Sequence, residues 1–299
     1  MPRFMKKITV IGAGIMGNGI AHVFSQHGFP VNLVDLHPAQ LEKAMGIIAK
    51  NLDRQVQKGG LTAEEKQQTL QRIVPVNDLK TGVAEADLIV EAVSENAEIK
   101  LNIFRELDKH APPDAVLASN TSSISITRIG GATTNPSRVI GMHFMNPVPV
   151  MKLVEVINGY ATSASVTHTV TEIAKQLDKI PCVVNDYPGF IANRILMPMI
   201  NEAIISLQEG VAGVEAIDTV MKLGMAHPMG PLQLADFIGL DICLSILKVL
   251  HEGFGNPKYA PSPLLVNMVN AGFLGVKSGE GFYRYSSGSK ELLVSERFL

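Results

Sequence analysis

The stretch Lys7-Ile8-Thr9-Val10-Ile11-Gly12-Ala13-Gly14-Ile15-Met16-Gly17 is the segment that decides the fold of this chain. It predicts a β-branched strand that runs directly into the glycine pattern G-x-G-x-x-G and then into a helix. A second apolar run, Val31-Asn32-Leu33-Val34, ends at Asp35, about 20 residues beyond the glycines. A strand, a glycine turn, a helix and an acid in this order are typical of a unit that binds a dinucleotide.

Each glycine has a physical purpose in this interpretation. Gly12 allows a tight turn, Gly14 lets the backbone approach a pyrophosphate, and Gly17 lets the helix pack closely against the strand. The helix N-terminus then presents N–H groups and the positive end of its dipole to the phosphates. The alternative is a glycine-rich turn that binds nothing, and the surrounding strand, helix and acid argue against it.

Asp35 predicts which dinucleotide is bound. A carboxylate at this place can accept hydrogen bonds from the hydroxyls of the adenine ribose, and it repels a 2′-phosphate. The next residues are Leu36-His37-Pro38, with no arginine to receive such a phosphate. We therefore expect NAD rather than NADP. FAD uses the same fold, but nothing later in the chain favours it.

The composition fits a globular protein of one large or two ordinary domains, since 46% of its 299 residues are hydrophobic. The formal net charge is −2 and there is no basic block, so we expect no nucleic-acid partner. No apolar run is typical of a membrane span and no motif indicates a metal, so we expect a cytoplasmic protein. The two cysteines, Cys182 and Cys243, lie far apart in apolar runs, and we expect both to be reduced and buried.

The first part of the chain, residues 1–186, alternates short apolar strands with helices that have one polar face. This rhythm predicts a Rossmann-type, doubly wound α/β domain with a parallel sheet and helices on both faces. Residues 39–72 predict a helical hairpin, broken at Gly59-Gly60, that projects beside the cofactor site. Six runs have the composition of strands: residues 7–12, 30–35, 87–91, 115–119, 138–142 and 152–157.

The second part, residues 187–299, predicts an all-helical domain for substrate binding and dimerisation. Strand signals stop after Asn185, and Pro188 suits the first turn of a helix. The segment 230–250 carries few charges, which predicts a helix buried on nearly every side, either at a subunit interface or in the core of the domain. We expect a homodimer formed through this domain. Apolar residues at helical spacing cover residues 190–208, 214–223 and 232–251.

His143 and Glu155 are the residues best suited to acid–base chemistry. His143 follows a strand candidate, and a side chain at the carboxyl end of such a strand points into the ligand crevice. Glu155 lies in the apolar run Lys152-Leu153-Val154-Glu155-Val156-Ile157, where a carboxylate needs a partner. A carboxylate on one ring nitrogen fixes the histidine tautomer and leaves the other nitrogen as a base. Either residue alone could be structural; their joint placement beside a cofactor fold favours a catalytic pair.

Two further polar features lie in positions where a ligand could be bound. The run Ser119-Asn120-Thr121-Ser122-Ser123 follows a strand at the same edge of the sheet. One of its members can cap the helix expected over residues 124–129, which does not require five polar residues in a row. Asn193 lies on the first helix of the second domain, where the alternative is an ordinary solvent-facing amide.

The chain resembles the L-3-hydroxyacyl-CoA dehydrogenase family, in its short-chain 3-hydroxybutyryl-CoA form, over essentially its whole length. The resemblance implies reversible, NAD-dependent oxidation of an L-3-hydroxyacyl-CoA to the 3-oxoacyl-CoA, with His143 as the base, Glu155 as its partner, and Ser122 and Asn193 on the substrate oxygens. The segments that carry it are Gly12-Ala13-Gly14-Ile15-Met16-Gly17, Ala118-Ser119-Asn120-Thr121-Ser122-Ser123, His143-Phe144-Met145-Asn146-Pro147-Val148-Pro149-Val150-Met151-Lys152-Leu153-Val154-Glu155-Val156, Asp186-Tyr187-Pro188-Gly189-Phe190-Ile191-Ala192-Asn193-Arg194, Pro228-Met229-Gly230-Pro231 and Gly279-Glu280-Gly281-Phe282-Tyr283.

The same resemblance implies further contacts. Lys50 and Lys58, on the helical hairpin, are expected to bind the phosphates of CoA. The alternative, which the sequence favours equally, is that both are ordinary solvent-exposed lysines. Asn51 departs from the serine of the animal members, which puts the detail of the CoA contacts in question. The residues implied around the cofactor are the glycine loop with Ile15 and Met16, Asp35, Glu95, Lys100, Ser122, Asn146 and Lys277, with Glu95 and Asn146 near the nicotinamide and Lys100 near substrate or cofactor.

Two other functions stay open on the sequence. A dehydrogenase of a free hydroxy or sugar acid such as L-gulonate would keep the glycine pattern, His143, Glu155 and Asn193 without needing basic residues on the hairpin. A catalytically silent NAD-binding protein would not need the set Ser122, His143, Glu155 and Asn193. The length of the acyl chain, and whether the pathway is fatty-acid, butanoate or aromatic degradation, do not follow from the sequence.

Overall fold

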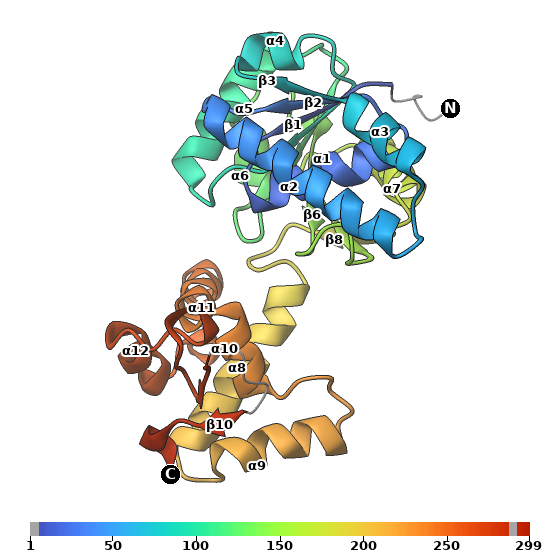
Figure 1. Ribbon diagram of the computed structural model, residues 1–299. Helices are drawn as coiled ribbons and strands as arrows, with labels where there is room; N and C mark the ends of the chain where they lie inside the picture. The colour runs from blue at the N-terminus through green and yellow to red at the C-terminus, as the bar shows by residue number, and fades with distance from the viewer. Residues whose placement is uncertain (1–5, 287–291) are drawn as a thin grey trace. The chain divides into compact units, whose positions relative to one another are not determined.

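The structure, a computed structural model, describes residues 6–286 and 292–299. The chain divides into two compact units, Met1–Tyr187 and Pro188–Leu299. In Figure 1 the N-terminal unit runs from blue to green and the C-terminal unit from yellow to red. The boundary lies within the segment Asp186-Tyr187-Pro188-Gly189, where the proline and glycine interrupt regular structure.

The N-terminal unit is built on one sheet. Its described residues form eight strands in the order β3-β2-β1-β4-β5-β6-β7-β8. Every neighbouring pair is parallel except β6 and β7, which are antiparallel. The strands are β1 (Ile8–Ile11), β2 (Val31–Val34), β3 (Ile73–Val76), β4 (Leu88–Glu91), β5 (Val116–Ser119), β6 (Val139–Phe144), β7 (Leu153–Asn158) and β8 (Ile180–Asn185).

The sequence patterns did not predict β3 or β8, which form the two edges of this sheet. Each contains a proline, Pro75 or Pro181, and a proline is tolerated in an edge strand because no neighbour needs its missing N–H. Both strands are largely exposed although their sequences are apolar, and the proline inside each run argues against a strand when the sequence is read alone. Cys182 lies on β8 and is exposed, which corrects the expectation that both cysteines are buried; Cys243 is buried as expected.

The antiparallel pair β6–β7 corrects the expectation of a wholly parallel sheet. The connection between these strands, residues 145–152, contains no helix and is too short for the crossover that two parallel strands need. The chain therefore turns back directly. In this register His143 on β6 pairs with Glu155 on β7, which places both side chains on the same face of the sheet.

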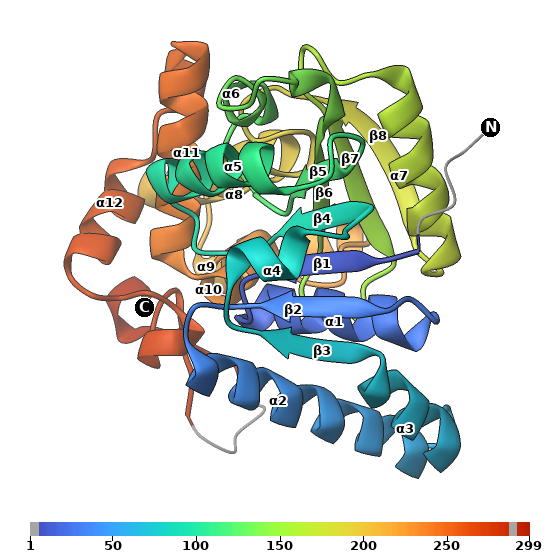
Figure 2. The same ribbon diagram turned by 90° about the horizontal axis from the view of Figure 1, so that it is seen from above.

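Helices cover both faces of the sheet, as a doubly wound fold requires (Figure 2). Helices α4, α5 and α6 form one layer, in which α4 contacts β1, β2 and β3 and α6 contacts β6 and β7. Helix α1 contacts β1 and β2, and α7 contacts β6, β7 and β8. The bounds are α1 (Ile15–Gln26), α4 (Leu79–Val83), α5 (Ala97–His110), α6 (Ile126–Gly130) and α7 (Ala164–Gln176), with the short 3-10 helix η1 (Pro136–Arg138).

The predicted hairpin is present as α2 (Pro38–Gln57) and α3 (Ala63–Gln71), both of which contact α1. Thr62 begins α3 in a capping box with Glu65, because each side chain binds the backbone N–H of the other residue. Helix α2 is held by apolar residues that repeat at helical spacing, and burying each large one contributes roughly 1.5–3 kcal/mol. The buried residues of α2 are Leu41, Ala44, Ile48 and Leu52.

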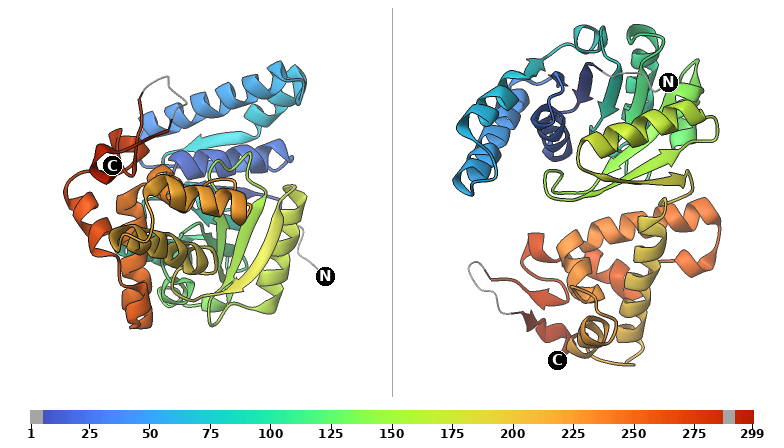
Figure 3. Two further views of the ribbon diagram at one scale, coloured as in Figure 1. Left: turned by 90° about the horizontal axis from the view of Figure 1, so that it is seen from below. Right: turned by 90° about the vertical axis from the view of Figure 1, so that its right-hand side faces the viewer.

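The C-terminal unit is helical and packs around α8, which contacts α9, α10, α11 and α12 (Figure 3). Its apolar core is separate from that of the sheet and includes residues from all five of these helices. The bounds are α8 (Ala192–Gln208), α9 (Val214–Thr219), the π-helix η2 (Val220–Gly224), α10 (Pro231–Ile238), α11 (Leu240–Phe254), α12 (Pro263–Asn270), the 3-10 helices η3 (Pro257–Tyr259), η4 (Val276–Ser278) and η5 (Glu296–Phe298), and the strand pair β9 (Tyr283–Arg284) and β10 (Leu293–Val294).

One expectation for the C-terminal unit is corrected. The single helix expected over residues 232–251 is two helices, since Gly239 has φ +104°, a conformation that ends α10 and begins α11. In the single chain Phe237 is 68% exposed and Ile242 is 45% exposed, while Asp236, directly before Phe237, is buried. Within residues 6–286 and 292–299, no helix combines the length and the apolar character that a membrane span requires.

Candidate active site

The glycine turn between β1 and α1 has the geometry that the sequence predicts. Gly12 has φ +94°, and a Cβ there would lie 2.8 Å from the carbonyl oxygen of Ala92. A Cβ on Gly17 would lie 1.7 Å from the carbonyl oxygen of Gly12, so only glycine allows α1 to pack this closely. Gly14 has open space beside it, and α1 begins at Ile15 without a side-chain cap. The turn therefore keeps room for a ligand at a helix N-terminus.

Asp35 is held in place at the end of β2. Its carboxylate accepts hydrogen bonds from the backbone N–H of Ala13 at 2.9 Å and from that of His37 at 3.0 Å. These bonds orient the carboxylate while leaving it lone pairs for a ribose hydroxyl. A cavity of about 410 Å³ opens beside it, lined by Gly12, Gly14, Asp35, His37, Ala39, Gln40, Ala92, Val93 and Ser94.

His143 and Glu155 form a buried hydrogen-bonded pair. The ring Nδ1 of His143 lies 2.8 Å from Oε2 of Glu155, and their side chains are 12% and 1% exposed. A carboxylate accepts a hydrogen bond, so the neutral ring carries its proton on Nδ1 and its lone pair on Nε2. The register of β6 and β7 makes the two residues direct cross-strand neighbours, which explains why a spacing along the sequence becomes a contact in space.

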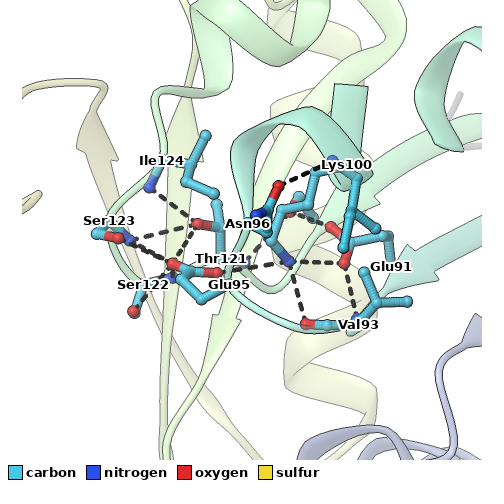
Figure 4. A network of polar contacts seen from close by, with 11 residues as sticks. Glu91, Val93, Glu95, Asn96, Lys100, Thr121, Ser122, Ser123 and Ile124 are labelled. Atoms are coloured by element: carbon cyan, nitrogen blue, oxygen red, sulfur yellow. Dashed lines mark hydrogen bonds and ion pairs between the residues drawn. The ribbon is translucent and has the colours of Figure 1, made fainter. Parts of the chain in front are cut away.

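The carboxylate of Glu95 accepts hydrogen bonds from several residues of the polar run that follows β5 (Figure 4). Its Oε1 accepts hydrogen bonds from the backbone N–H groups of Ser122 and Ser123, at 2.9 and 3.0 Å. The same oxygen lies within hydrogen-bond distance of the hydroxyls of Thr121, Ser122 and Ser123. The helix cap that was expected within this run is instead Ser125, whose hydroxyl accepts the N–H of Arg128 at the start of α6. The N-cap of α6 thus lies outside this run, and the hydrogen bonds to Glu95 hold the conformation of the run.

The electrostatic surroundings of Glu95 keep it ionised. Partial burial alone would raise the pKa of this carboxyl. The positive charge of Lys100 and the hydrogen bonds from Thr121, Ser122 and Ser123 outweigh that effect and lower the pKa below its ordinary value. Glu95 is therefore a carboxylate at neutral pH, and the N–H and O–H groups around it act as donors to it.

The other candidate residues fall in three kinds of place. Asn146 is exposed just after β6, where a cis peptide bond joins it to Pro147. Lys50 and Lys58 are exposed on α2 and at its C-terminal end. Asn193 lies in the first turn of α8, and Lys277 forms an ion pair with Asp241; both belong to the C-terminal unit. Among the residues that the structure describes, no cluster of histidine, cysteine and acidic side chains could hold a metal.

Comparison with known protein families gives the affiliation of both units. Residues 7–187 match the model described as "3-hydroxyacyl-CoA dehydrogenase, NAD binding domain", and residues 189–285 match "3-hydroxyacyl-CoA dehydrogenase, C-terminal domain". This chain belongs to the 3-hydroxyacyl-CoA dehydrogenase family. The glycine turn and Asp35 therefore lie in the NAD-binding domain of this family.

Relatives within the 3-hydroxyacyl-CoA dehydrogenase family are similar over nearly their full lengths. A probable 3-hydroxybutyryl-CoA dehydrogenase of Deinococcus radiodurans is 56% identical and covers 93% of this chain and 100% of its own length. A 3-hydroxybutyryl-CoA dehydrogenase of Bradyrhizobium diazoefficiens is 54% identical and covers 95% of this chain and 97% of its own length. The crystal structure of (S)-3-hydroxybutyryl-CoA dehydrogenase from Ralstonia eutropha has a TM-score of 0.93 at 45% identity, and covers 95% of this chain and all of its own.

Sequence reasoning missed Glu91, which lies beneath the polar run that begins at Ser119. Glu91 ends β4 with no exposed surface, and its carboxylate accepts hydrogen bonds from Lys100 and from the Ser119 hydroxyl, each at 2.6 Å. The signal was present in the sequence, because Leu88-Ile89-Val90-Glu91 places a carboxylate in an apolar strand, as happens at Glu155. Lys100 is also buried, and the contacts of its ammonium group are with the protein itself.

Proposed function

We propose that the protein catalyses the reversible, NAD-dependent oxidation of an L-3-hydroxyacyl-CoA to the 3-oxoacyl-CoA. The observation that carries this proposal is the His143–Glu155 pair, a base with a buried carboxylate partner, in a chain of the 3-hydroxyacyl-CoA dehydrogenase family. A short acyl chain is favoured, because full-length relatives are named 3-hydroxybutyryl-CoA dehydrogenases. Such a reaction belongs to fatty-acid metabolism.

The proton transfer follows from the orientation of the imidazole ring. Nε2 of His143 takes the proton of the substrate 3-hydroxyl. Bound NAD would supply the acceptor for the hydride that C3 loses. Glu155 accepts the hydrogen bond from Nδ1 and offsets the positive charge that grows on the ring. In the reverse direction the imidazolium returns its proton to the oxygen that forms at C3.

Ser122 and Asn193 complete the proposal as donors to the substrate oxygens, one at the reacting oxygen and one at the thioester carbonyl. For Ser122 the support is its place in the Glu95-bound turn, where its backbone is fixed by a 2.9 Å hydrogen bond. For Asn193 the support is the resemblance to the family. Glu95, Asn146 and Lys277 are proposed to contact the cofactor on the same ground.

Lys50 and Lys58 are proposed to bind the phosphates of CoA. Both are exposed on the α2–α3 hairpin, so they are accessible to an anion. The double variant Lys50→Glu/Lys58→Glu should raise the KM for acetoacetyl-CoA and leave the KM for NADH unchanged. An unchanged KM for acetoacetyl-CoA would make both lysines ordinary surface residues.

The deciding experiment follows the absorbance of NADH with acetoacetyl-CoA, beside acetoacetate, L-gulonate with NAD, and NADPH as controls. Turnover with acetoacetyl-CoA and NADH, but not with NADPH or acetoacetate, would support the reaction, the need for CoA and the proposed role of Asp35. NAD reduction by L-gulonate without reaction of acetoacetyl-CoA would instead assign a sugar-acid dehydrogenase.

His143→Gln separates an enzyme from a silent NAD-binding protein. Removing a general base lowers kcat by roughly 10²- to 10⁴-fold, while the affinity for NADH, measured by fluorescence titration, should be retained. If the wild-type protein binds NADH yet turns over no more substrate than the variant, the catalytic proposal fails.

We further propose a homodimer assembled through the C-terminal unit and a cytoplasmic location. The exposed apolar residues Phe237 and Ile242 support an interface, since burying large apolar side chains favours association. Two unpaired thiols, Cys182 and Cys243, suit a reducing compartment. Sedimentation as a monomer at micromolar concentration would exclude the dimer.

A further inference from the structure

A buried ion pair lies beneath the polar run that carries Ser122. Nζ of Lys100, on α5, lies 2.6 Å from Oε1 of Glu91, at the end of β4, and the two side chains are 1% and 0% exposed. The Glu91 carboxylate is fully engaged, because it also accepts the N–H of Val93 at 2.8 Å and the hydroxyl of Ser119 at 2.6 Å. Neither charge of this pair faces solvent.

Two routes lead from this pair to the polar run. In the first, Nζ of Lys100 lies 3.5 Å from Oε2 of Glu95, whose other oxygen accepts the N–H groups of Ser122 and Ser123 (Figure 4). In the second, Glu91 orients the hydroxyl of Ser119, which in turn accepts the backbone N–H of Thr121 at 3.2 Å. The pair therefore joins the loop after β4 to the loop after β5.

Stability alone is a poor explanation for this arrangement. A buried ion pair is often no more stabilising than apolar side chains of the same volume, because both charges must be removed from water. An apolar pair at these positions would fill the space, but it could not attract the carboxylate of Glu95 or orient the Ser119 hydroxyl. The charges are better explained by what they hold in place.

We propose that Lys100 is a positioning residue that acts through Glu95 to fix the backbone and hydroxyl of Ser122. With 1% of its side chain exposed, Lys100 lies behind the turn that carries Ser122. The inference rests on the proposed function only in that Ser122 meets the substrate. The charge of Lys100 attracts the carboxylate of Glu95 and helps to lower its pKa, and Oε1 of this carboxylate accepts the N–H groups of the turn.

The test uses variants that keep the buried region neutral. Lys100→Met alone would leave Glu91 as an uncompensated buried charge and could unfold the domain. The double variant Glu91→Gln/Lys100→Met removes both charges at nearly constant volume, and its thermal unfolding shows whether it is folded. Lys109→Met is the matched control, because Lys109 lies on the same helix in an exposed ion pair with Glu106.

In the double variant we expect kcat with acetoacetyl-CoA to fall roughly 10- to 100-fold, the loss typical of a misplaced group at a reacting centre. The triple variant that adds Glu95→Gln to this double variant should have the same kcat as Glu95→Gln alone, because the effects of residues that act through one another are not additive. Losses that multiply, or a double variant as active as Lys109→Met, would overturn the proposal.

Hydrogen–deuterium exchange tests the inference independently of activity. The N–H groups of Ser122 and Ser123 donate to Glu95, so a peptide covering residues 119–125 should exchange faster in the double variant and at the wild-type rate in Lys109→Met. If wild-type protein fails to reduce acetoacetyl-CoA, the proposed function is wrong, and exchange alone then decides the role of Lys100. Unchanged exchange in this peptide would show that Lys100 does not fix the turn.

Discussion

Glu155 is a carboxylate with 1% of its side chain exposed, inside a strand of apolar neighbours. A charge in such a place is tolerated because the Nδ1–H of His143 satisfies it. His22 is the opposite case, a titratable ring on α1 with no exposed surface, whose Nε2 lies 3.3 Å from the amide nitrogen of Gln55. Its burial, reinforced by the charges of His27 and Lys179, lowers the pKa of His22 to about 4.

Glu155→Gln should lower kcat with little effect on folding. The amide can still contact Nδ1 of His143, but it cannot offset the charge that develops on the ring. A hydrogen bond between charged groups contributes about 1.5–3 kcal/mol, which corresponds to a loss of roughly 10- to 100-fold in kcat. Steady-state kinetics with acetoacetyl-CoA and NADH measure this loss. A variant with wild-type kcat would remove Glu155 from the mechanism.

The lowered pKa of His22 predicts that acid destabilises the N-terminal unit. The unfolded chain binds a proton near pH 6.5, whereas the folded chain binds it only near pH 4. The stability contributed by neutral His22 is therefore complete above pH 6.5 and is lost as the pH falls toward 4. Between pH 7 and pH 5 the free energy of unfolding should fall by about 2 kcal/mol.

Urea unfolding of wild-type protein and of His22→Leu at both pH values measures this effect. The variant should lose that part of the pH dependence. The exposed histidine His168 on α7 provides the control, since His168→Leu should keep the wild-type pH dependence. Equal pH dependence in His22→Leu and wild-type protein would show that His22 is not the group responsible.

Helix boundaries in this chain depend on glycines whose backbone the sequence pattern does not reveal. Apolar spacing continues without a break across residues 232–251, which is why one helix was expected there. The structure instead has α10 and α11, separated by Gly239 at φ +104°. Gly46 lies in the middle of α2, exposed and in ordinary helical conformation. The two glycines therefore differ in what a side chain would cost.

Replacing each of these glycines by alanine should shift stability in opposite directions. Gly239→Ala forces an L-residue into a region open mainly to glycine, and should destabilise the protein by roughly 1–3 kcal/mol. Gly46→Ala adds a good helix former with open space around it, and should stabilise by up to about 1 kcal/mol. Thermal unfolding of both variants tests the prediction, and shifts of the same sign would contradict it.

The fold class was predictable from the sequence because a buried parallel strand reads as a continuous apolar run, and most of the sheet consists of such strands. The exposed edge strands β3 and β8 were not predicted, since Pro75 and Pro181 interrupt their short apolar runs. The contact of His143 with Glu155 could be inferred because an isolated charge in an apolar strand demands a partner. The network of Glu91, Lys100 and Glu95 could not be assembled, because its members come from separate elements.

The thiols of the two cysteines should differ in reactivity, because one is exposed on the N-terminal unit and the other is buried in the C-terminal unit. Cys182 is exposed on the edge strand β8, whereas Cys243 is buried on α11, where burial raises the pKa of its thiol to about 12. We expect one thiol to react quickly with a disulfide reagent in native protein and two in urea, because only exposed thiolate reacts. Cys182→Ser should abolish the fast reaction. Two fast thiols in native protein would mean that the C-terminal core is open.

The antiparallel strand pair β6–β7 has a consequence for how this catalyst can change over time. The proposed base and its carboxylate partner come from one uninterrupted stretch, His143 to Glu155, and their spacing is set by the strand register alone. A recombination event or a designed exchange that moves residues 139–158 as a block would transfer both residues of this pair together. Substrate preference, by contrast, can drift through substitutions elsewhere without disturbing that pair, so new substrates can be explored while the chemistry is inherited intact.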